Sequence, residues 1–317
     1  MTSWFASLLF VTASIAQTPA APKPAAPAAP QPFDRVAVLG ASLSECFGVE
    51  PEIGAPVWIG DVLRAALKHE VEAPRRHSSL LFFTAPRMLG PKAASDALAA
   101  EPTFVLALDW LFWFGYGEFP SDEKRMESFE LGLKQLEPFR CPVLVGDLPD
   151  MRGALDGVPK MLQESQVPRV ETLAAMNARL AQWAKEREHV VLAPLAELTA
   201  KIQAGKEFLL RGNAIHASEL PELLQGDKLH PTAMGTIVVW IAAADALVKK
   251  RADVPAAWFE WNRQQIYRRL YAAQEPARKA KLLERQKKFE RENPYKPPPP
   301  PDPAEVERKR RGGDDGG

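Results

Sequence analysis

Cysteine is scarce in this chain, which has only Cys46 and Cys141 among its 317 residues. Two cysteines without a Cys-x-x-Cys pattern do not form a disulfide framework or a zinc site. The five histidines show no metal-ligand spacing either, and no Gly-rich phosphate-binding loop occurs. We therefore expect no metal and no cofactor.

A surplus of one charge is also missing, because 40 Lys and Arg balance 40 Asp and Glu. Nothing in this balance suggests a nucleic-acid partner. The charges are distributed unevenly along the chain, since residues 251–317 hold 16 basic against 11 acidic residues and are therefore positive. The rest of the chain is correspondingly negative.

Long hydrophobic runs are absent as well. The first run, residues 4–15, is too short to span a bilayer comfortably, and Ser14-Ile-Ala16 supplies small residues that signal peptidase prefers. We predict a signal peptide over 1–16 and export to the periplasm or the extracellular space. No Lys or Arg precedes the run, so a disordered or membrane-resting N-terminus stays open. Residues 17–33 are almost wholly Ala and Pro and predict an extended linker.

What is present starts with a short apolar run that leads directly to a serine. Val36 to Leu39 are continuously apolar, as in a strand that is covered on both faces, and Gly40 permits a tight turn after it. This arrangement would present Ser42 at the carboxyl end of a sheet. Open α/β sheets bind their ligands at that edge.

A nucleophilic serine needs a base, and the base needs a carboxylate that holds its tautomer. Asp227 and His230 stand three residues apart just before Pro231 and supply both from one loop. Gly-Ala-Ser-Leu-Ser at the first strand and Asp-x-x-His-Pro near the last helix together resemble the SGNH, or GDSL-type, hydrolases. The resemblance implies that Ser42 is the nucleophile, His230 the general base and Asp227 its orienting carboxylate.

Two other family blocks differ from this sequence. The usual Gly-Asp-Ser is Gly40-Ala41-Ser42 here, and the Gly-x-Asn-Asp block, whose asparagine helps to bind the oxyanion, is absent from 106–113. The resemblance places the glycine of the second block at Gly90. The oxyanion donors would then be the Ser42 and Gly90 amides plus one unidentified group.

Asp109 ends the third predicted strand, and the aromatic residues at positions 110, 112, 113, 114 and 116 follow it. One interpretation is that the Trp110 indole replaces the missing asparagine, with Asp109 orienting a donor, and that the aromatics wall an acyl or sugar pocket. The alternative is ordinary core packing. Asn213 is a further candidate donor, and Asp147 or Asp150 could contact substrate or replace Asp227. Cys46 is interpreted as a small buried hydrophobic residue rather than a second nucleophile.

The predicted fold is α/β. Five apolar runs alternate with helical patterns, which favours a five-stranded parallel sheet in three α/β/α layers, and the family resemblance implies the flavodoxin-like SGNH version of this fold. The predicted strands are 36–39, 79–83, 103–108, 142–145 and 189–193. Helices are predicted to begin at Pro56, after Ser121, around Leu173 and at Pro231. The hydrolase domain would cover 34–252.

After this domain the sequence predicts one long charged helix within 253–293, docked at its aromatic start and solvated at its end, and then a Pro- and Gly-rich tail over 294–317. The helix is either a solvated surface or a contact to the envelope or to a protein. The predicted activity is hydrolysis of esters of lipids or carbohydrates. The alternative is a degenerate SGNH-like domain that binds a polysaccharide or protein without turnover.

Overall fold

The computed structural model describes residues 31–293 and 306–307. Five parallel strands form one sheet in the order β2-β1-β3-β4-β5. The strands are β1 (Val36–Val38), β2 (Arg75–Arg76), β3 (Phe104–Ala107), β4 (Val143–Gly146) and β5 (Val190–Ala193). The prediction of a five-stranded parallel sheet is confirmed.

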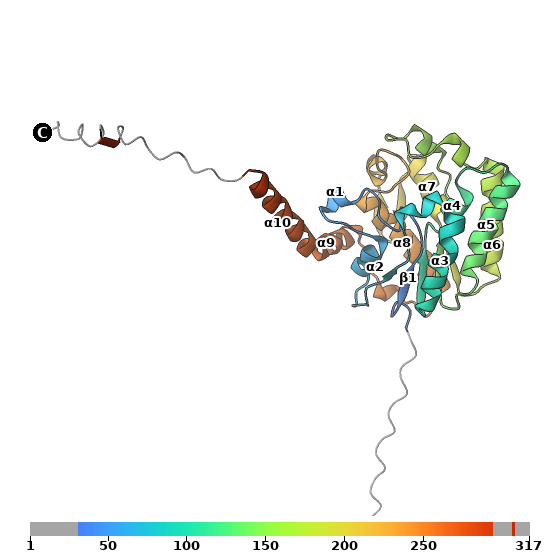
Figure 1. Ribbon diagram of the computed structural model, residues 1–317. Helices are drawn as coiled ribbons and strands as arrows, with labels where there is room; N and C mark the ends of the chain where they lie inside the picture. Colours follow the sequence, from blue (N-terminus) through green and yellow to red (C-terminus); the bar gives the residue numbers. More distant parts are fainter. Residues whose placement is uncertain (1–30, 294–305, 308–317) are drawn as a thin grey trace, which may run out of the picture. The chain divides into compact units, whose positions relative to one another are not determined.

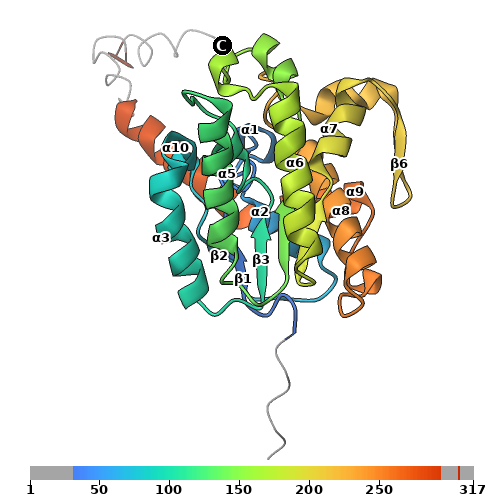
Figure 2. The same cartoon turned by 90° about the vertical axis from the view of Figure 1, so that its right-hand side faces the viewer.

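Helices cover both faces of this sheet, as Figures 1 and 2 show. Val105 and Val143 pack in one apolar cluster with α3 (Pro86–Ala99), α5 (Asp122–Leu136) and α6 (Val170–Lys185). Leu106 and Leu144 point to the other face and pack with α2 (Ile59–Ala66), α8 (Ala233–Lys250) and α9 (Arg263–Ala273). Alternate residues thus bury opposite faces, which explains why the strand sequences are continuously apolar. The three-layer α/β/α prediction is confirmed.

The strand predicted over Ser79–Phe83 is wrong. The second strand is β2, and Leu80–Thr84 forms a 3-10 helix, η1. The Ser79 hydroxyl accepts a hydrogen bond from the Leu81 amide and caps the helix, while Phe82 is buried against the rings of Trp110 and Phe114. A single aromatic anchor and a serine cap therefore stabilise a helical turn where the short apolar run indicated a strand.

Helix starts follow the capping residues. Ser121 caps α5 as predicted, and Thr232 rather than Pro231 caps α8. The helix expected from Pro56 begins at Ile59. Several short elements were not predicted: α1 (Glu50–Ile53), α4 (Phe112–Gly115), η2 (Arg152–Asp156), η3 (Glu164–Gln166), α7 (Leu195–Gln203), the β6 (Phe208–Leu210) and β7 (Asn213–Ile215) hairpin, and η4 (Ala217–Leu223).

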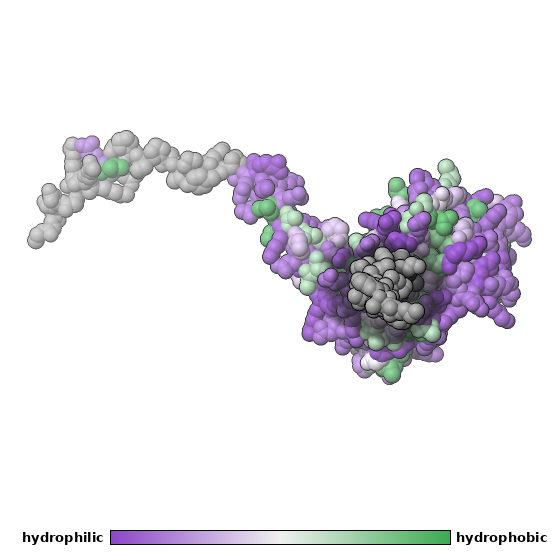
Figure 3. All heavy atoms as spheres, turned by 90° about the horizontal axis from the view of Figure 1, so that it is seen from below, coloured by the Kyte–Doolittle hydropathy of each residue, from purple (hydrophilic) through white to green (hydrophobic). Residues whose placement is uncertain are grey.

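The single C-terminal helix expected within 253–293 is a series of separate helices: η5 (Ala256–Trp258), α9, and α10 (Glu275–Glu292). Ile266 and Leu270 of α9 are buried in the same apolar cluster as α2 and α8. Helix α10 begins as a separate helix with Pro276 in its first turn, and none of its residues is buried. Hydrophobic residues are interspersed among hydrophilic ones along α10 in Figure 3.

The predicted signal peptide over 1–16, most of the 17–33 linker and nearly all of the 294–317 tail lie outside the described residues. Among residues that the structure describes, no helix is long and apolar enough to cross a membrane. Cys46 and Cys141 are both free. Cys46 is buried in the apolar cluster beside β1, and burial raises the pKa of its thiol strongly, as expected for a small hydrophobic residue rather than a nucleophile.

Candidate active site

The chain turns sharply after β1, and this turn carries Ser42 at the carboxyl end of the sheet. The Glu45 amide donates to the Ala41 carbonyl at 2.9 Å, and the Phe47 amide donates to the Ser42 carbonyl at 2.9 Å. Ser42 itself is half-buried. The turn is thus closed by its own backbone around a serine that remains accessible.

A buried carboxylate from the next strand, Asp109, holds the turn from below. Its Oδ2 accepts hydrogen bonds from the amides of Ala41, Leu43 and Ser44 at 3.0, 2.9 and 3.3 Å, and its Oδ1 accepts the Ser44 hydroxyl at 2.5 Å. Asp109 accepts no hydrogen bond from the amide of Ser42. In the part of the chain that the structure describes, this amide has no acceptor. Asp109 therefore fixes the backbone on both sides of Ser42 and leaves the Ser42 amide available to a ligand.

Gly40 is required for this contact. A Cβ at Gly40, where φ is +153°, would lie 2.0 Å from Asp109 Oδ1 and 2.2 Å from the Ser44 hydroxyl. Burial raises the pKa of Asp109, although its hydrogen bonds with the Ser44 hydroxyl and the turn amides oppose the rise. The carboxyl group thus holds the turn that carries Ser42 in place.

The Asp227–His230 loop is the second part of the site. His230 Nδ1 lies 2.7 Å from Asp227 Oδ2, and Asp227 Oδ1 accepts the amides of Leu229 and His230 at 2.9 Å each. Burial alone would raise the pKa of Asp227, but the bonds from the His230 amide and ring and from the Leu229 amide lower it overall. Asp227 is therefore ionised and contacts Nδ1 of His230, and Nε2 of His230 is not engaged by Asp227.

The His230 loop is attached to the nucleophile turn. Gln225 donates its side-chain amide to the Phe47 carbonyl at 2.6 Å and to the Pro231 carbonyl at 2.8 Å, and its backbone amide donates to the His230 carbonyl. The rings of Phe47 and His230 lie 4.6 Å apart. These contacts join segments almost 180 residues apart in the sequence.

Ser42 and His230 line one pocket, which is otherwise largely apolar. Its further lining residues come from the turn after β1, from the segments after β3 and β4, from α7, from the end of η4 and the loop that follows it, and from α8: Leu43, Leu108, Asp109, Phe112, Trp113, Asp147, Pro149, Met151, Leu195, Leu198, Thr199, Ile202, Leu223, Leu224, Leu229, Pro231, Gly235 and Val239. The two residues therefore do not lie on opposite sheet edges. In the described chain no hydrogen bond joins the Ser42 hydroxyl to His230.

Three predicted site residues lie elsewhere. Gly90 is in the middle of α3, where a Cβ would meet Gln135 and Phe114, so it serves helix packing and not oxyanion binding. The Trp110 indole is fully buried and donates to the Gly132 carbonyl at 3.1 Å. Asn213 donates to the carbonyls of Leu210 and Trp261 and closes the β6–β7 hairpin. None of the three lines the pocket.

Trp113 is the residue of this aromatic segment that stands out. It lines the pocket and is only 6% exposed, and its indole Nε1 is buried without an acceptor in the described chain. A buried donor of this kind is rare unless a ligand, a water molecule or a local movement satisfies it. Sequence reasoning identified the segment from position 110 to 113 but selected Trp110.

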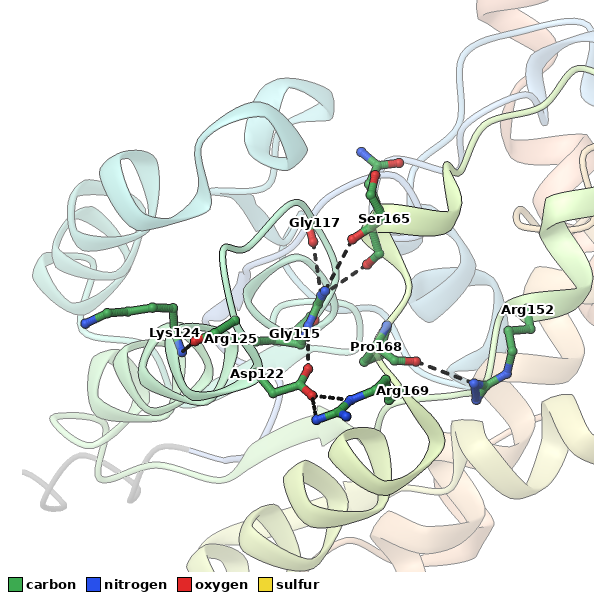
Figure 4. A network of polar contacts seen from close by, with 11 residues as sticks. Gly115, Gly117, Asp122, Lys124, Arg125, Arg152, Ser165, Pro168 and Arg169 are labelled. Carbon is green, nitrogen blue, oxygen red and sulfur yellow. Dashed lines mark hydrogen bonds and ion pairs between the residues drawn. The ribbon is translucent and has the colours of Figure 1, made fainter.

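Hydrogen bonds of Tyr116 and Arg125 fix the aromatic wall of the pocket. The Tyr116 hydroxyl donates to the Pro149 carbonyl at 2.6 Å and accepts the Met151 amide at 3.1 Å, while its ring stacks on Phe112 at 4.0 Å. Nearby, the buried Arg125 guanidinium donates to the carbonyls of Gly115, Gly117, Ser165 and Gln166 (Figure 4). The loops after β3 and β4 are thereby held together around the pocket.

The remaining acidic candidates have structural partners. Asp147 lines the pocket and accepts the Ala196 amide at 2.7 Å at the start of α7, and Asp150 pairs with Arg152. Neither replaces Asp227 at His230. Among the described residues, no group of three or more Asp, Glu, His or Cys side chains is arranged to hold a metal ion.

No family model matches the chain, and no curated protein matches it. Its fold is similar to those of several solved structures, including the following three. A gut microbial diltiazem-metabolizing enzyme shares 12% identity over 70% of this chain and 47% of its own, with a TM-score of 0.43. The lipase/acylhydrolase from Enterococcus faecalis shares 12% identity over 68% and 96%, with a TM-score of 0.40. A protein of Desulfitobacterium hafniense described as lipolytic and of the G-D-S-L family shares 13% over 67% and 99%, with a TM-score of 0.39.

These structural neighbours thus include proteins of the GDSL lipase and acylhydrolase type. The chain spans about half the length of the first of the three. At such low identities and TM-scores the likeness carries no weight for the reaction, which has to be inferred from the side chains of the site itself.

Proposed function

We propose that this protein is a serine hydrolase of the SGNH type that cleaves carboxylic esters. One observation supports the proposal above all others: Ser42 and the hydrogen-bonded Asp227–His230 pair line the same apolar pocket. A hydroxyl, an imidazole and a buried carboxylate in one pocket are the components of nucleophilic acyl transfer. The apolar lining suits the acyl group of the ester.

In the proposed reaction, Ser42 Oγ attacks the carbonyl carbon while His230 Nε2 takes its proton. The resulting imidazolium is stabilised by Asp227 through Nδ1. The bond to the alcohol then breaks, and His230 gives its proton to the leaving oxygen. In the second half, His230 deprotonates water, which attacks the acyl-enzyme and releases the carboxylic acid, and Ser42 regains its proton.

The oxyanion would be bound by groups that lack an acceptor in the described chain. The Ser42 amide is one, because Asp109 binds its neighbours and skips it. The Trp113 indole N–H is the other, since it is an unsatisfied donor on a pocket-lining residue. Together they would take the role that the family gives to an asparagine, with a modest turn of the Trp113 ring exposing its N–H.

The experiment that tests this function is labelling with a fluorophosphonate probe, which needs an activated serine. Wild-type protein should be labelled and should hydrolyse p-nitrophenyl esters, and Ser42→Ala should lose both while keeping its melting temperature. Ser44→Ala is not a suitable control, because its hydroxyl binds Asp109. Ser95→Ala on α3 is a better one and should be labelled like wild type. Equal labelling of wild type and Ser42→Ala would exclude Ser42 as the nucleophile.

A second candidate function is a degenerate domain that binds a polysaccharide or a protein without turnover. The unformed hydrogen bond between Ser42 and His230 and the placement of Gly90 and Asn213 away from the pocket favour it. The same probe separates the two functions. A folded protein whose Ser42 is never labelled and which cleaves no ester in a broad panel would be the binding domain.

A further inference from the structure

An unusual concentration of exposed apolar side chains lies on η1 and on the first turn of α3. Leu80, Leu81, Phe83, Met88 and Leu89, here called the apolar lip, account for five of the fifteen large hydrophobic residues that are exposed in the described chain. All five fall within ten consecutive residues, and Leu81 and Met88 are 66% and 79% exposed. Contiguous apolar surface of this kind marks an interaction site more often than it marks chance.

The apolar lip is placed beside the mouth of the pocket. At its start, the Ser79 amide donates to the Gly40 carbonyl at 3.1 Å, which ties it to the nucleophile turn. At its centre, the Phe83 ring lies 5.5 Å from the ring of Trp113, which lines the pocket. The neighbouring Phe82 anchors η1 on the buried Trp110, so the exposed side chains are presented by a fixed turn.

The sequence around the apolar lip is basic. Residues 73–95 include Arg75, Arg76, Arg87 and Lys92 and contain no Asp or Glu. Arg76 is paired with the buried Glu45, and Lys92 with Asp96 of the next turn. Arg75 reaches away from the lip, because its guanidinium donates to the Ala100 carbonyl at the far end of α3. Arg87 forms no ion pair in the described structure and lies in the first turn of α3 next to Met88. An apolar surface with this cation at its border is complementary to an anionic lipid surface.

We propose that the apolar lip docks on an anionic lipid surface, from which ester substrates pass into the pocket. The docking surface itself follows from exposure and charge, and only the fate of the lipid ester rests on the proposed function. The Phe83–Trp113 contact makes the exposed surface continuous with the pocket wall.

The test is flotation of the full chain, as the Ser42→Ala variant, with vesicles of phosphatidylcholine alone or mixed with phosphatidylglycerol. We expect binding to the mixed vesicles that weakens with added salt. The double change Leu81→Ser and Met88→Ser should weaken it about tenfold or more, since each side chain would lose its burial in lipid. Leu209→Ser on β6 is the matched control, because Leu209 is 74% exposed, and it should bind like the parent.

Several results would overturn the proposal. The protein would bind neither kind of vesicle, or the Leu209→Ser control would lose as much binding as the double variant. Full binding by the double variant would also overturn it and would assign the lipid contact to another surface such as α10. Sedimentation showing a dimer that the double variant dissociates would assign the apolar lip to a second copy. Vesicle binding does not require turnover. A protein that binds vesicles but cleaves no soluble ester would therefore contradict the proposed function and leave the docking surface standing.

Discussion

The two sides of the pocket differ in how far their hydrogen-bonding groups are satisfied. On the His230 side, Asp227 accepts the imidazole and two backbone amides, so its hydrogen bonds are complete without substrate. On the opposite side, the Ser42 amide and the Trp113 indole have no acceptor in the described chain. The difference suggests a division of labour. Under the proposed function, the side that transfers protons would be organised in advance, and the side that binds the carbonyl oxygen would be completed by the substrate.

The largest expected effect comes from breaking the organised side with Asp227→Asn. The amide would keep an oxygen for the backbone donors but would present a donor to Nδ1, and His230 would then carry its proton on Nε2 and could not accept the Ser42 proton. We expect kcat for ester hydrolysis to fall by about 10⁴-fold while the protein stays folded. Steady-state kinetics on a p-nitrophenyl ester measures this.

Asp150→Asn is the matched control, because Asp150 lies on the loop after β4 but pairs with Arg152 and not with His230. It should leave kcat nearly unaltered. If the two variants lost activity equally, Asp227 would not be the carboxylate that orients the base.

The next effect concerns the side that the substrate completes. Trp113→Phe removes the indole N–H and keeps an aromatic ring against Phe83 and Phe112. If this donor binds the oxyanion, kcat should fall by about 10²- to 10³-fold with little change in KM, because the oxyanion exists only in the transition state and its intermediate.

Trp183→Phe provides the comparison for a donor outside the site. The Trp183 indole is also buried without an acceptor in the described chain, but Trp183 belongs to α6, lies under Arg187 and does not line the pocket. This variant should keep its kcat. Trp110→Ala should instead destabilise the fold by about 3–5 kcal/mol, since Trp110 is a packed core residue. Unaltered kcat in Trp113→Phe would remove Trp113 from the oxyanion site.

A smaller effect on activity and a clear one on stability should follow from Asp109→Asn. The amide group would face donors of the nucleophile turn, and each buried donor that loses its acceptor costs about 1–3 kcal/mol. Urea unfolding measures the loss, and slower probe labelling would report the loosened turn. Asp245→Asn, whose partners Arg211 and Lys249 lie at the surface, should cost only about 0–1 kcal/mol. Equal losses of unfolding free energy in the two variants would mean that Asp109 stabilises the fold no more than a surface ion pair does.

The sequence predicted those features that are encoded locally. Strands such as β3 were predictable because Val105 and Leu106 bury opposite faces and therefore leave a continuous apolar run. The pairing of Asp227 and His230 was expected because a three-residue spacing in one loop brings the side chains together. The element η1 was mistaken for a strand because its short apolar run has no periodicity that distinguishes a strand from a helical turn.

The side of the pocket with the Ser42 amide and Trp113 could not be predicted, because tertiary packing decides which tryptophan indole finds an acceptor in the core. Trp110 and Trp113 differ little in sequence context, yet one donates to the Gly132 carbonyl and the other keeps a free N–H. Asn213 looked available, but the Trp261 carbonyl, 48 positions along the chain, binds its amide. No local pattern records these partners.

The smallest predicted effect tests whether the organised side also stabilises the fold. The pKa of Asp227 is lower in the folded protein than in the unfolded chain, so its carboxylate contributes stability that is present above the unfolded value of about 3.9 and is lost as the pH falls through the lowered one. The difference in free energy of unfolding between wild type and Asp227→Asn should therefore shrink as the pH falls below about 4. Asp109, whose pKa is raised, acts with the opposite sign but is common to both proteins and cancels. Urea unfolding at a series of pH values measures the difference, and a gap that stays constant from neutral to acidic pH would show that Asp227 serves catalysis without stabilising the loop.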